Sequence, residues 1–182
     1  MSIVVNLFGV PSAGKSTGAA YIFSQLKLAG VNCELVTEYA KDKVWEENKE
    51  IFKPENQVYI FAKQFYRMNR CKDKVDVIIT DSPLLLSAFY NKSAVLGREF
   101  NNLAAHCFNS FYNKNYLLLR DKPYNPRGRL QTEEESDNLK KPLLDLLNKY
   151  EVEFETTFNY VSSFPKLSQP SRSFLANNSI LL

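Results

Sequence analysis

The stretch that decides the fold is FGVPSAGKST, residues Phe8–Thr17, close to the start of the chain. It completes the pattern G-x-x-x-x-G-K-[ST] with Gly9, Gly14, Lys15 and Ser16. Glycines at these places let backbone N–H groups turn inward around phosphate oxygens without a Cβ in the way. The pattern carries this meaning between a strand and a helix, and the flanking segments SIVVNLF and KSTGAAYIFSQLKLAG predict both. The sequence therefore predicts a phosphate-binding loop for a nucleotide.

Each part of this loop has an expected contact. The helix that begins near Lys15 directs the positive end of its dipole at the phosphates. We expect Lys15 to reach the β- and γ-phosphates and the Ser16 hydroxyl to bind the metal. The expected cofactors are ATP and Mg²⁺, although the loop does not distinguish ATP from other triphosphates. The residues expected to bind the nucleotide are Gly9, Ser12, Ala13, Gly14, Lys15, Ser16 and Thr17, with Arg120 later in the chain.

Length and composition favour one soluble domain. The chain has 182 residues and a mass of 21.0 kDa, and no apolar run approaches the roughly 20 residues that span a bilayer. The first residues lack the pattern of a signal peptide and read as a core strand. Cys33, Cys71 and Cys107 are odd in number and scattered, which predicts neither disulfides nor a zinc site. We therefore expect a cytoplasmic location (the host cytoplasm for a viral protein) and no membrane partner.

The charge permits an anionic substrate without requiring one. The net charge is +3 and the pI about 8.6. These values allow nucleic acid as a partner, but the pI is below the value of about 9 that is typical of a dedicated DNA-binding domain.

Strand and helix signals alternate along the chain and predict an α/β domain with a mostly parallel sheet flanked by helices on both faces. Strands are expected at 2–8, 32–38, 75–80, 115–120 and 152–161, and helices at 15–30, 54–71, 83–90 and 98–112. Gly30 should close the first helix, and Thr132 and Glu135 form a capping box for a later one. Pro142 should kink that later helix or split it in two. The predicted domain covers 1–160, with a mobile lid at about 120–136, and 161–182 is a tail without a clear period.

Asp81 follows the hydrophobic strand VDVIIT, where P-loop proteins place a carboxylate that orders Mg²⁺ or takes a proton from the acceptor. The alternative is an N-cap aspartate for the helix near Pro83, and both roles are compatible. No Asn-Lys-x-Asp guanine reader is present, which argues against a GTPase. We also see no room for the extra segments of a ring-forming motor ATPase.

An arginine-rich loop follows the fourth strand, where small kinases keep a closing lid. Arg120, Arg127 and Arg129 could neutralise charge on a transferring phosphoryl group and exclude water. The alternative is a solvated loop whose arginines pair with the acidic run EEES.

The acceptor side is expected after the second strand. Glu38 would lie at the carboxyl end of that strand and could accept a hydroxyl proton or hold a sugar. The alternative is a surface glutamate that starts a helix. The helix from Pro54 carries Gln64 and Arg67, which could read a base edge and a phosphate. The alternative is that they are ordinary surface residues of this helix. The expected acceptor-binding residues are Glu38, Lys41, Gln64 and Arg67.

Five segments carry a resemblance to a known family: GVPSAGKST, TEYAKD, AKQFYRM, VIITDSP and NPRGRLQTEEESDNLKKPLLDLLNKYEVEFE. Over about residues 3–160 the chain resembles the P-loop kinases related to the nicotinamide-riboside kinase domain of NadR, a group with many compact bacteriophage members. The resemblance implies a P-loop NTPase fold of the nucleoside and nucleotide kinase type. It also implies transfer of the γ-phosphoryl group of ATP·Mg²⁺ to a hydroxyl of a nucleoside-like acceptor.

The resemblance also assigns residues. Lys15 and Ser16 match phosphate and metal contacts, Asp81 matches the acid after the third strand, and Arg129 matches the lid arginine. Glu38 matches the acid of a Glu-x-x-Arg pattern, but Lys41 stands where the arginine is usual, and Lys cannot make the forked contact of Arg. Some phage relatives phosphorylate 5-hydroxymethyluracil already in DNA.

The leading hypothesis is therefore an ATP-dependent kinase for a hydroxyl of a nucleoside-type acceptor, free or within DNA. It leans to 5-hydroxymethyluracil in phage DNA, with nicotinamide riboside or another free nucleoside as the alternative. A regulatory ATP-binding switch protein is the alternative from another class. The expected catalytic residues are Lys15, Asp81, Glu38, Arg127 and Arg129, and the expected metal ligands are Ser16 and Asp81. The sequence leaves open which of Asp81 and Glu38 is the base, and also the oligomeric state.

Overall fold

The computed structural model describes residues 1–158, and its centre is a five-stranded sheet in the order β2-β3-β1-β4-β5. All four pairings are parallel. The strands are β1 (Ile3–Phe8), β2 (Cys33–Val36), β3 (Val77–Thr80), β4 (Tyr112–Leu119) and β5 (Glu155–Phe158). The predicted α/β class and the parallel sheet are confirmed.

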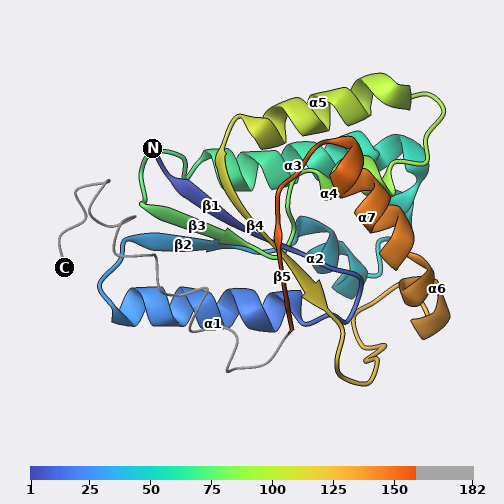
Figure 1. The fold of residues 1–182 in the computed structure, drawn as a ribbon. Coiled ribbons are helices and arrows are strands. Elements are labelled where there is room, and N and C mark those ends of the chain that lie inside the picture. Colours follow the sequence, from blue (N-terminus) through green and yellow to red (C-terminus); the bar gives the residue numbers. More distant parts are fainter. Residues whose placement is uncertain (159–182) are drawn as a thin grey trace.

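Helices cover both faces of this sheet. Figure 1 shows α1 on one face and α3, α4 and α5 on the other. The helices are α1 (Lys15–Leu28), α2 (Tyr39–Trp45), α3 (Gln57–Asn69), α4 (Leu86–Tyr90), α5 (Gly97–Asn109), α6 (Glu133–Asn138) and α7 (Lys140–Lys149). Two short 3-10 helices, Lys49–Phe52 and Pro54–Asn56, precede α3. No helix among residues 1–158 is both long and apolar enough to span a bilayer.

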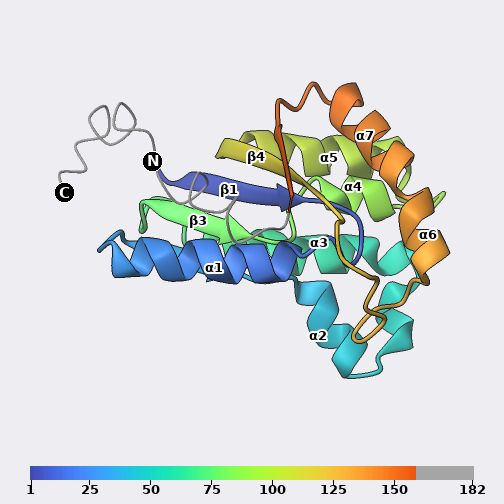
Figure 2. The same cartoon turned by 60° about the horizontal axis from the view of Figure 1, so that its bottom comes forward.

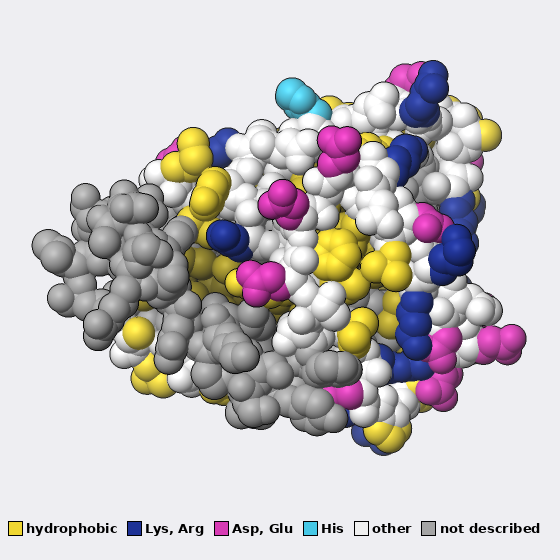
Figure 3. All heavy atoms as spheres, viewed as in Figure 1, with side chains coloured by type: hydrophobic (Ala, Val, Ile, Leu, Met, Phe, Trp, Pro, Cys, Tyr) yellow, Lys and Arg dark blue, Asp and Glu magenta, His cyan; other side chains and the backbone are white. Residues whose placement is uncertain are grey.

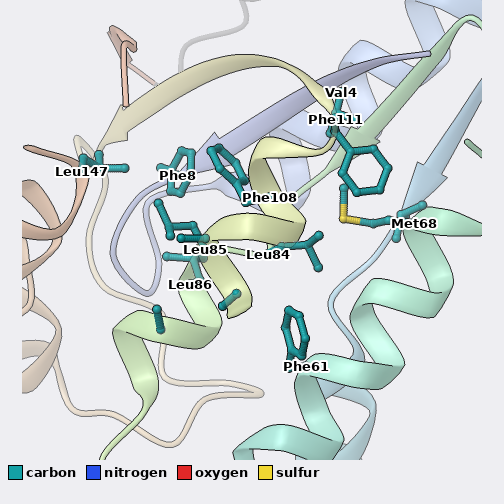
Figure 4. Close-up of a cluster of buried hydrophobic side chains, with 14 of the residues drawn as sticks. Val4, Phe8, Phe61, Met68, Leu84, Leu85, Leu86, Phe108, Phe111 and Leu147 are labelled. Atoms are coloured by element: carbon teal, nitrogen blue, oxygen red, sulfur yellow. The ribbon is translucent and has the colours of Figure 1, made fainter. Parts of the chain in front are cut away.

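The alternation of side chains along β1 creates two cores. Val4 and Phe8 point to the face with α3, α4, α5 and α7, whereas Val5 and Leu7 pack with α1 on the opposite face. In the larger core, the Phe8 ring meets Phe108 of α5 edge to face with ring centroids 6.1 Å apart (Figure 4). Every residue of β1 is buried, which explains why its sequence, IVVNLF, is apolar at every position except Asn6.

The register brings three loops to one edge of the sheet. Asn6 of β1 pairs with Thr80 of β3, and Thr80 pairs in turn with Val36 of β2. Because parallel strands end at the same edge, the loop after β1 lies beside the residues that follow β2 and β3. The strand ends alone thus gather the phosphate loop, Glu38 and Asp81.

Several local expectations are confirmed. The helix after the phosphate loop ends just before Gly30, which has a φ of +79°. Thr132 and Glu135 form both hydrogen bonds of the capping box at the start of α6. The predicted split is also present, since α6 and α7 are separate helices joined at Leu139. Pro142 is the third residue of α7, where its missing N–H costs no intrahelical hydrogen bond.

Several boundaries differ from the prediction; for example, α4 begins at Leu86 and not at 83, and β4 begins at Tyr112 and not at 115. The helix expected at 98–112 ends at Asn109, because Phe111 turns into the larger core and Tyr112 already pairs as the first residue of β4. The expected last strand covers only Glu155–Phe158 within the described residues, and the tail at 161–182 lies outside them.

The surface at α6 and α7 carries charges of both signs. Figure 3 shows Lys and Arg side chains mixed with Asp and Glu on the side where Figure 1 has these helices. Lys141 pairs with Asp145 and Lys140 with Asp137, each at 2.9 Å. Because such exposed pairs contribute little, this face is best described as a solvated charged surface.

Candidate active site

The phosphate loop lies between β1 and α1, as the motif requires. Gly14 is the N-cap of α1 and has a left-handed conformation with a φ of +88°. The first turn of α1 therefore directs its free backbone N–H groups toward the loop. Ser16 and Thr17 of this turn have exposed side chains.

The Lys15 ammonium lies inside the loop. Its Nζ donates hydrogen bonds to the carbonyl oxygens of Gly9 at 2.7 Å and Val10 at 3.1 Å. Burial lowers the pKa of Lys15, and the nearby carboxylates of Glu38 and Asp81 oppose that shift. A cation held this way is already desolvated, so it can move to a phosphate oxygen without first losing its water shell.

Asp81 and Glu38 form a pair of acids beside Lys15. Asp81 directly follows β3 and is 4% exposed, and its Oδ1 accepts a hydrogen bond from the backbone N–H of Glu38 at 3.1 Å. Burial raises the pKa of Glu38, while the charge of Lys15 works against this shift. The two acids thus differ in environment, since Asp81 has a fixed hydrogen-bond donor and burial raises the pKa of Glu38.

Gln64 of α3 holds Tyr39, the residue that follows Glu38. Its Oε1 accepts a hydrogen bond from the backbone N–H of Tyr39 at 2.9 Å, and the side chain is 3% exposed. The start of α2 is therefore held by two side chains, one from the end of β3 and one from α3. These anchors place Glu38 between the phosphate loop and α3.

The arginine-rich loop closes the site from the other side. The backbone N–H of Asn125 donates to Ser12 Oγ at 3.0 Å, and the buried Ser136 Oγ donates to the carbonyl oxygen of Pro11 at 2.9 Å. Gly128 lies against the Trp45 ring at the end of α2. Figure 2 shows this loop running from β4 past α2 to α6. The loop thus contacts both the phosphate loop and the helix that carries Lys41.

These elements enclose a cavity of about 500 Å³, within the range of small-molecule sites. All five predicted catalytic residues line it: Lys15, Glu38, Asp81, Arg127 and Arg129. The other predicted residues in its wall are Ser12, Gly14, Ser16, Thr17, Lys41 and Gln64.

Four predicted site residues lie elsewhere. Gly9 and Ala13 support the loop from beneath; Gly9 offers its carbonyl oxygen to Lys15, and Ala13 is buried in the smaller core. Arg67 pairs with Asp42 at 2.6 Å and lies over the Tyr39 ring, so it joins α3 to α2.

Arg120 is the fourth, and its guanidinium lies outside the cavity wall. It pairs with Asp137 at 2.5 Å and Glu133 at 3.4 Å, and it lies over the Tyr124 ring. One arginine, Arg120, therefore does pair with acids of α6, as the alternative of a solvated loop predicted. The other two arginines, Arg127 and Arg129, line the cavity.

The sequence prediction missed part of the wall. Tyr90, at the end of α4, lies close enough to Glu38 and Arg129 for their charges to affect it, and burial raises its pKa. Nothing in the spacing of Tyr90 singles it out, because it ends a short helix whose residues are mostly buried. Ser82 could have been found, since it directly follows Asp81. The further residues missed in the wall include Val44, Phe52, Leu86, Ser87, Lys92 and Gln131.

The available oxygen ligands fit Mg²⁺. No cluster of three or more His, Cys, Asp or Glu residues that could hold a metal ion occurs within residues 1–158. A protein cage for a transition metal is therefore not indicated in this part of the chain. Ser16 and Asp81 instead offer one hydroxyl and one carboxylate, which suits a cation that keeps several waters and takes its remaining ligands from phosphates.

Fold and site together define a P-loop domain: a parallel sheet whose central strand runs into a phosphate loop and helix. The chain belongs to the family described as AAA domain, whose model matches residues 4–157. That description names a class of domain and no reaction.

Two solved structures share the fold. A crystal structure of NadR protein in complex with NR has a TM-score of 0.69, and one of NadR protein in complex with NAD and AMP-PNP has a TM-score of 0.65. Both are 15% identical in sequence and match 98% of this chain, which spans only 50% and 48% of theirs. The predicted resemblance to NadR is confirmed at the level of the fold. No curated protein sequence matches the chain.

Proposed function

We propose that the protein is an ATP-dependent kinase that transfers the γ-phosphoryl group to a hydroxyl of a nucleoside-type acceptor. The observation that carries the proposal is the arrangement in one cavity of Lys15, the acid pair Glu38 and Asp81, and two loop arginines. A simple nucleotide-binding switch needs the phosphate loop but not a second, acid-lined compartment closed by arginines. The fold shared with NadR structures that hold NR and AMP-PNP supports the same reading.

The proposed mechanism depends on position and charge. Lys15 leaves the carbonyl oxygens of its own loop and binds the transferring phosphate, while Arg127 and Arg129 compensate the charge that spreads over its oxygens. When bound, Mg²⁺ supplies further neutralisation at the phosphates, held by Ser16 and Asp81. Glu38 takes the proton of the acceptor hydroxyl, because its raised pKa makes it a better base than an exposed glutamate.

Asp81→Asn and Glu38→Gln variants test whether both acids are needed for transfer. Loss of transfer with normal ATP binding in both variants supports a kinase with two essential acids. If neither variant nor the unmodified protein transfers phosphate to any hydroxyl, while ATP is still bound and slowly hydrolysed, the regulatory switch is the better description.

The exposed face of α3 supports an acceptor within DNA, and we propose 5-hydroxymethyluracil in DNA as the substrate. Tyr59, Lys63, Tyr66 and Arg70 recur at positions i, i+4, i+7 and i+11 and are all exposed, Tyr66 by 68%. The Lys63 Nζ lies 5.2 Å from the centre of the Tyr59 ring. Aromatic rings between cations are the pattern with which proteins bind single strands, and α3 contains no acid, unlike α7.

Helix α3 also contributes Gln57, Ile60 and Gln64 to the cavity wall, so a strand on its exposed face would lie next to the acceptor site. A free nucleoside such as nicotinamide riboside is the second candidate, supported by the NR held in the NadR structure of the same fold.

γ-labelled ATP with Mg²⁺ separates the two candidates. The acceptors are single-stranded and duplex DNA containing 5-hydroxymethyluracil, and a panel of free nucleosides that includes nicotinamide riboside. Label in the DNA, reduced by Tyr66→Ala and by added salt, supports the DNA substrate. A Lys141→Ala variant, which removes a cation from α7, is the matched control and should leave transfer unchanged. Label only on a free nucleoside would refute the DNA substrate and leave the kinase proposal intact.

A further inference from the structure

The side-chain amide of Gln64 is buried, and only its oxygen has a hydrogen-bond partner; its nitrogen has none among the described residues. Its Oε1 is fixed by the backbone N–H of Tyr39 at 2.9 Å. Its Nε2 has no hydrogen-bond partner in the described structure and has less than 1 Å² of exposed surface. A buried N–H₂ group without an acceptor has lost its hydrogen bonds to water without replacing them, so such groups are rare without a reason.

The orientation of this amide is determined by its surroundings. An N–H group such as that of Tyr39 requires an acceptor, and an amide nitrogen cannot supply one. A flipped Gln64 would bring two donors together, so the oxygen must face Tyr39 and the nitrogen must face the other way. Gln64 therefore offers the rest of the site a donor only.

Gln64 also lines the cavity, with Ile60 one turn before it on α3. Apolar side chains of Val44, Phe52 and Leu86 belong to the same wall, and the acids Glu38 and Asp81 lie toward the phosphate loop. A flat ring would find apolar contacts here, next to the group that activates its hydroxyl.

We propose that Gln64 is a specificity-determining residue that donates a hydrogen bond from Nε2 to a carbonyl oxygen of the acceptor's ring or amide. The inference rests on the proposed kinase function and narrows its substrate class. Because Nε2 is buried, the proposed contact requires the neighbouring wall side chains to shift outward when the acceptor binds. Because Oε1 faces the backbone N–H of Tyr39, the atom left for the acceptor is Nε2, and an amide nitrogen cannot accept from an amino group. For a pyrimidine acceptor the proposed contact is the oxygen at C4, so the site selects a uracil-type base, which has a carbonyl there, over a cytosine-type base, which has an amino group there.

The test compares two acceptors that differ at this one position, 5-hydroxymethyl-2′-deoxyuridine and 5-hydroxymethyl-2′-deoxycytidine, each free and within the same DNA oligonucleotide. The unmodified protein should show a kcat/KM roughly 10- to 100-fold higher for the uracil-type acceptor, the range expected when a buried donor is met or left unpaired. An equal rate for both, or a preference for the cytosine-type acceptor, would overturn the inference without any variant. Nicotinamide riboside and the same riboside without its carboxamide form a second pair with the same logic.

A Gln64→Glu variant gives a readout that a purely structural role would not change. One carboxylate oxygen still accepts from Tyr39, so α2 should stay in place, while the other oxygen replaces the donor. Preference should then invert toward the amino-bearing acceptor at high pH. At low pH the introduced carboxyl group is protonated and donates again, which should restore the original preference. An unchanged preference at all pH values would contradict the proposal.

Two further variants control for folding and charge. Asn69→Asp makes the same amide-to-acid change at the exposed end of the same helix and should leave the preference unchanged, with at most a small loss of thermal stability from a negative charge at the helix C-terminus. Gln64→Leu removes both halves of the amide and should lower stability and reduce transfer to both acceptors, with no inversion. If the unmodified protein phosphorylates no acceptor, the kinase proposal fails; if it does so with a preference that Gln64→Glu leaves unchanged, only this inference fails.

Discussion

The contact between Gly128 and Trp45 makes the arginine-rich loop open to a quantitative test. Gly128 has a φ of +69°, a left-handed conformation, and a Cβ at this position would lie 2.6 Å from Cζ2 of Trp45. A Gly128→Ala change therefore meets two penalties at once. The backbone penalty arises at residue 128 itself, and the steric penalty arises where the loop rests on α2.

The backbone term alone amounts to about 1–2 kcal/mol for a residue with a Cβ. The Trp45 side chain is 64% exposed and can swing outward, so the steric term costs mainly the contact between loop and helix. Because every 1.4 kcal/mol is a factor of ten, the closed arrangement of the loop should lose roughly 5- to 30-fold in population. If closure brings Arg127 and Arg129 to the phosphates, kcat/KM falls by the same factor.

The assay is γ-phosphoryl transfer in parallel with thermal unfolding. Gly30→Ala is the matched control, because Gly30 also has a positive φ of +79° but its Cβ would meet nothing within 4 Å, far from the cavity. This control should lower stability and leave kcat/KM unchanged. A Gly128→Ala protein with full activity and stability lowered as much as in the control would show that the loop is a fixed wall, which would refute its role as a lid.

Three further changes separate binding, electrostatic and structural roles. Lys15→Ala should abolish ATP binding in calorimetry with little change in unfolding temperature. Undiminished phosphoryl transfer by this variant would refute both the kinase hypothesis and the switch-protein hypothesis. Glu38→Gln should raise the free energy of unfolding at neutral pH, since burial raises the pKa of this carboxyl and its ionised form costs stability. In urea titrations the difference in the free energy of unfolding between the variant and the unmodified protein should vanish as the pH falls toward the ordinary glutamate pKa of about 4.3. A difference that stays constant with pH would contradict this prediction. Arg67→Ala should cost less than about 1 kcal/mol by losing its half-exposed pair with Asp42, and an increased acceptor KM would argue for a direct substrate role.

The sequence predicted the parts of the site that follow strand ends. The phosphate loop, Glu38 and Asp81 each come directly after a strand or within two residues of one, and parallel pairing brings such positions together whatever the details of packing. The capping box was also predictable, because it depends on side chains three residues apart.

Roles that depend on contacts between helices were harder to predict. Arg67 has a suitable type and spacing for a phosphate contact, yet the packing of α2 on α3 brings Asp42 to it instead. Arg120 likewise meets the acids of α6. Tyr90 belongs to the cavity wall because of the orientation of α4, and no local sequence pattern predicts that orientation. Sequence spacing gives the face of a helix but not the element that this face meets.

Two hydrogen bonds join the phosphate loop to the arginine-rich loop and to α6, and they affect the order in which the protein folds. Ser12 and Pro11 find their partners 113 and 125 residues later, at Asn125 and Ser136. Contacts of such sequence separation form late, because the intervening chain must first be ordered. During synthesis the motif emerges from the ribosome 113 residues before Asn125, and Pro11 emerges 125 residues before Ser136. The nucleotide site should therefore mature as one of the last steps of folding, so that ATP stabilises completed molecules and not partly folded chains.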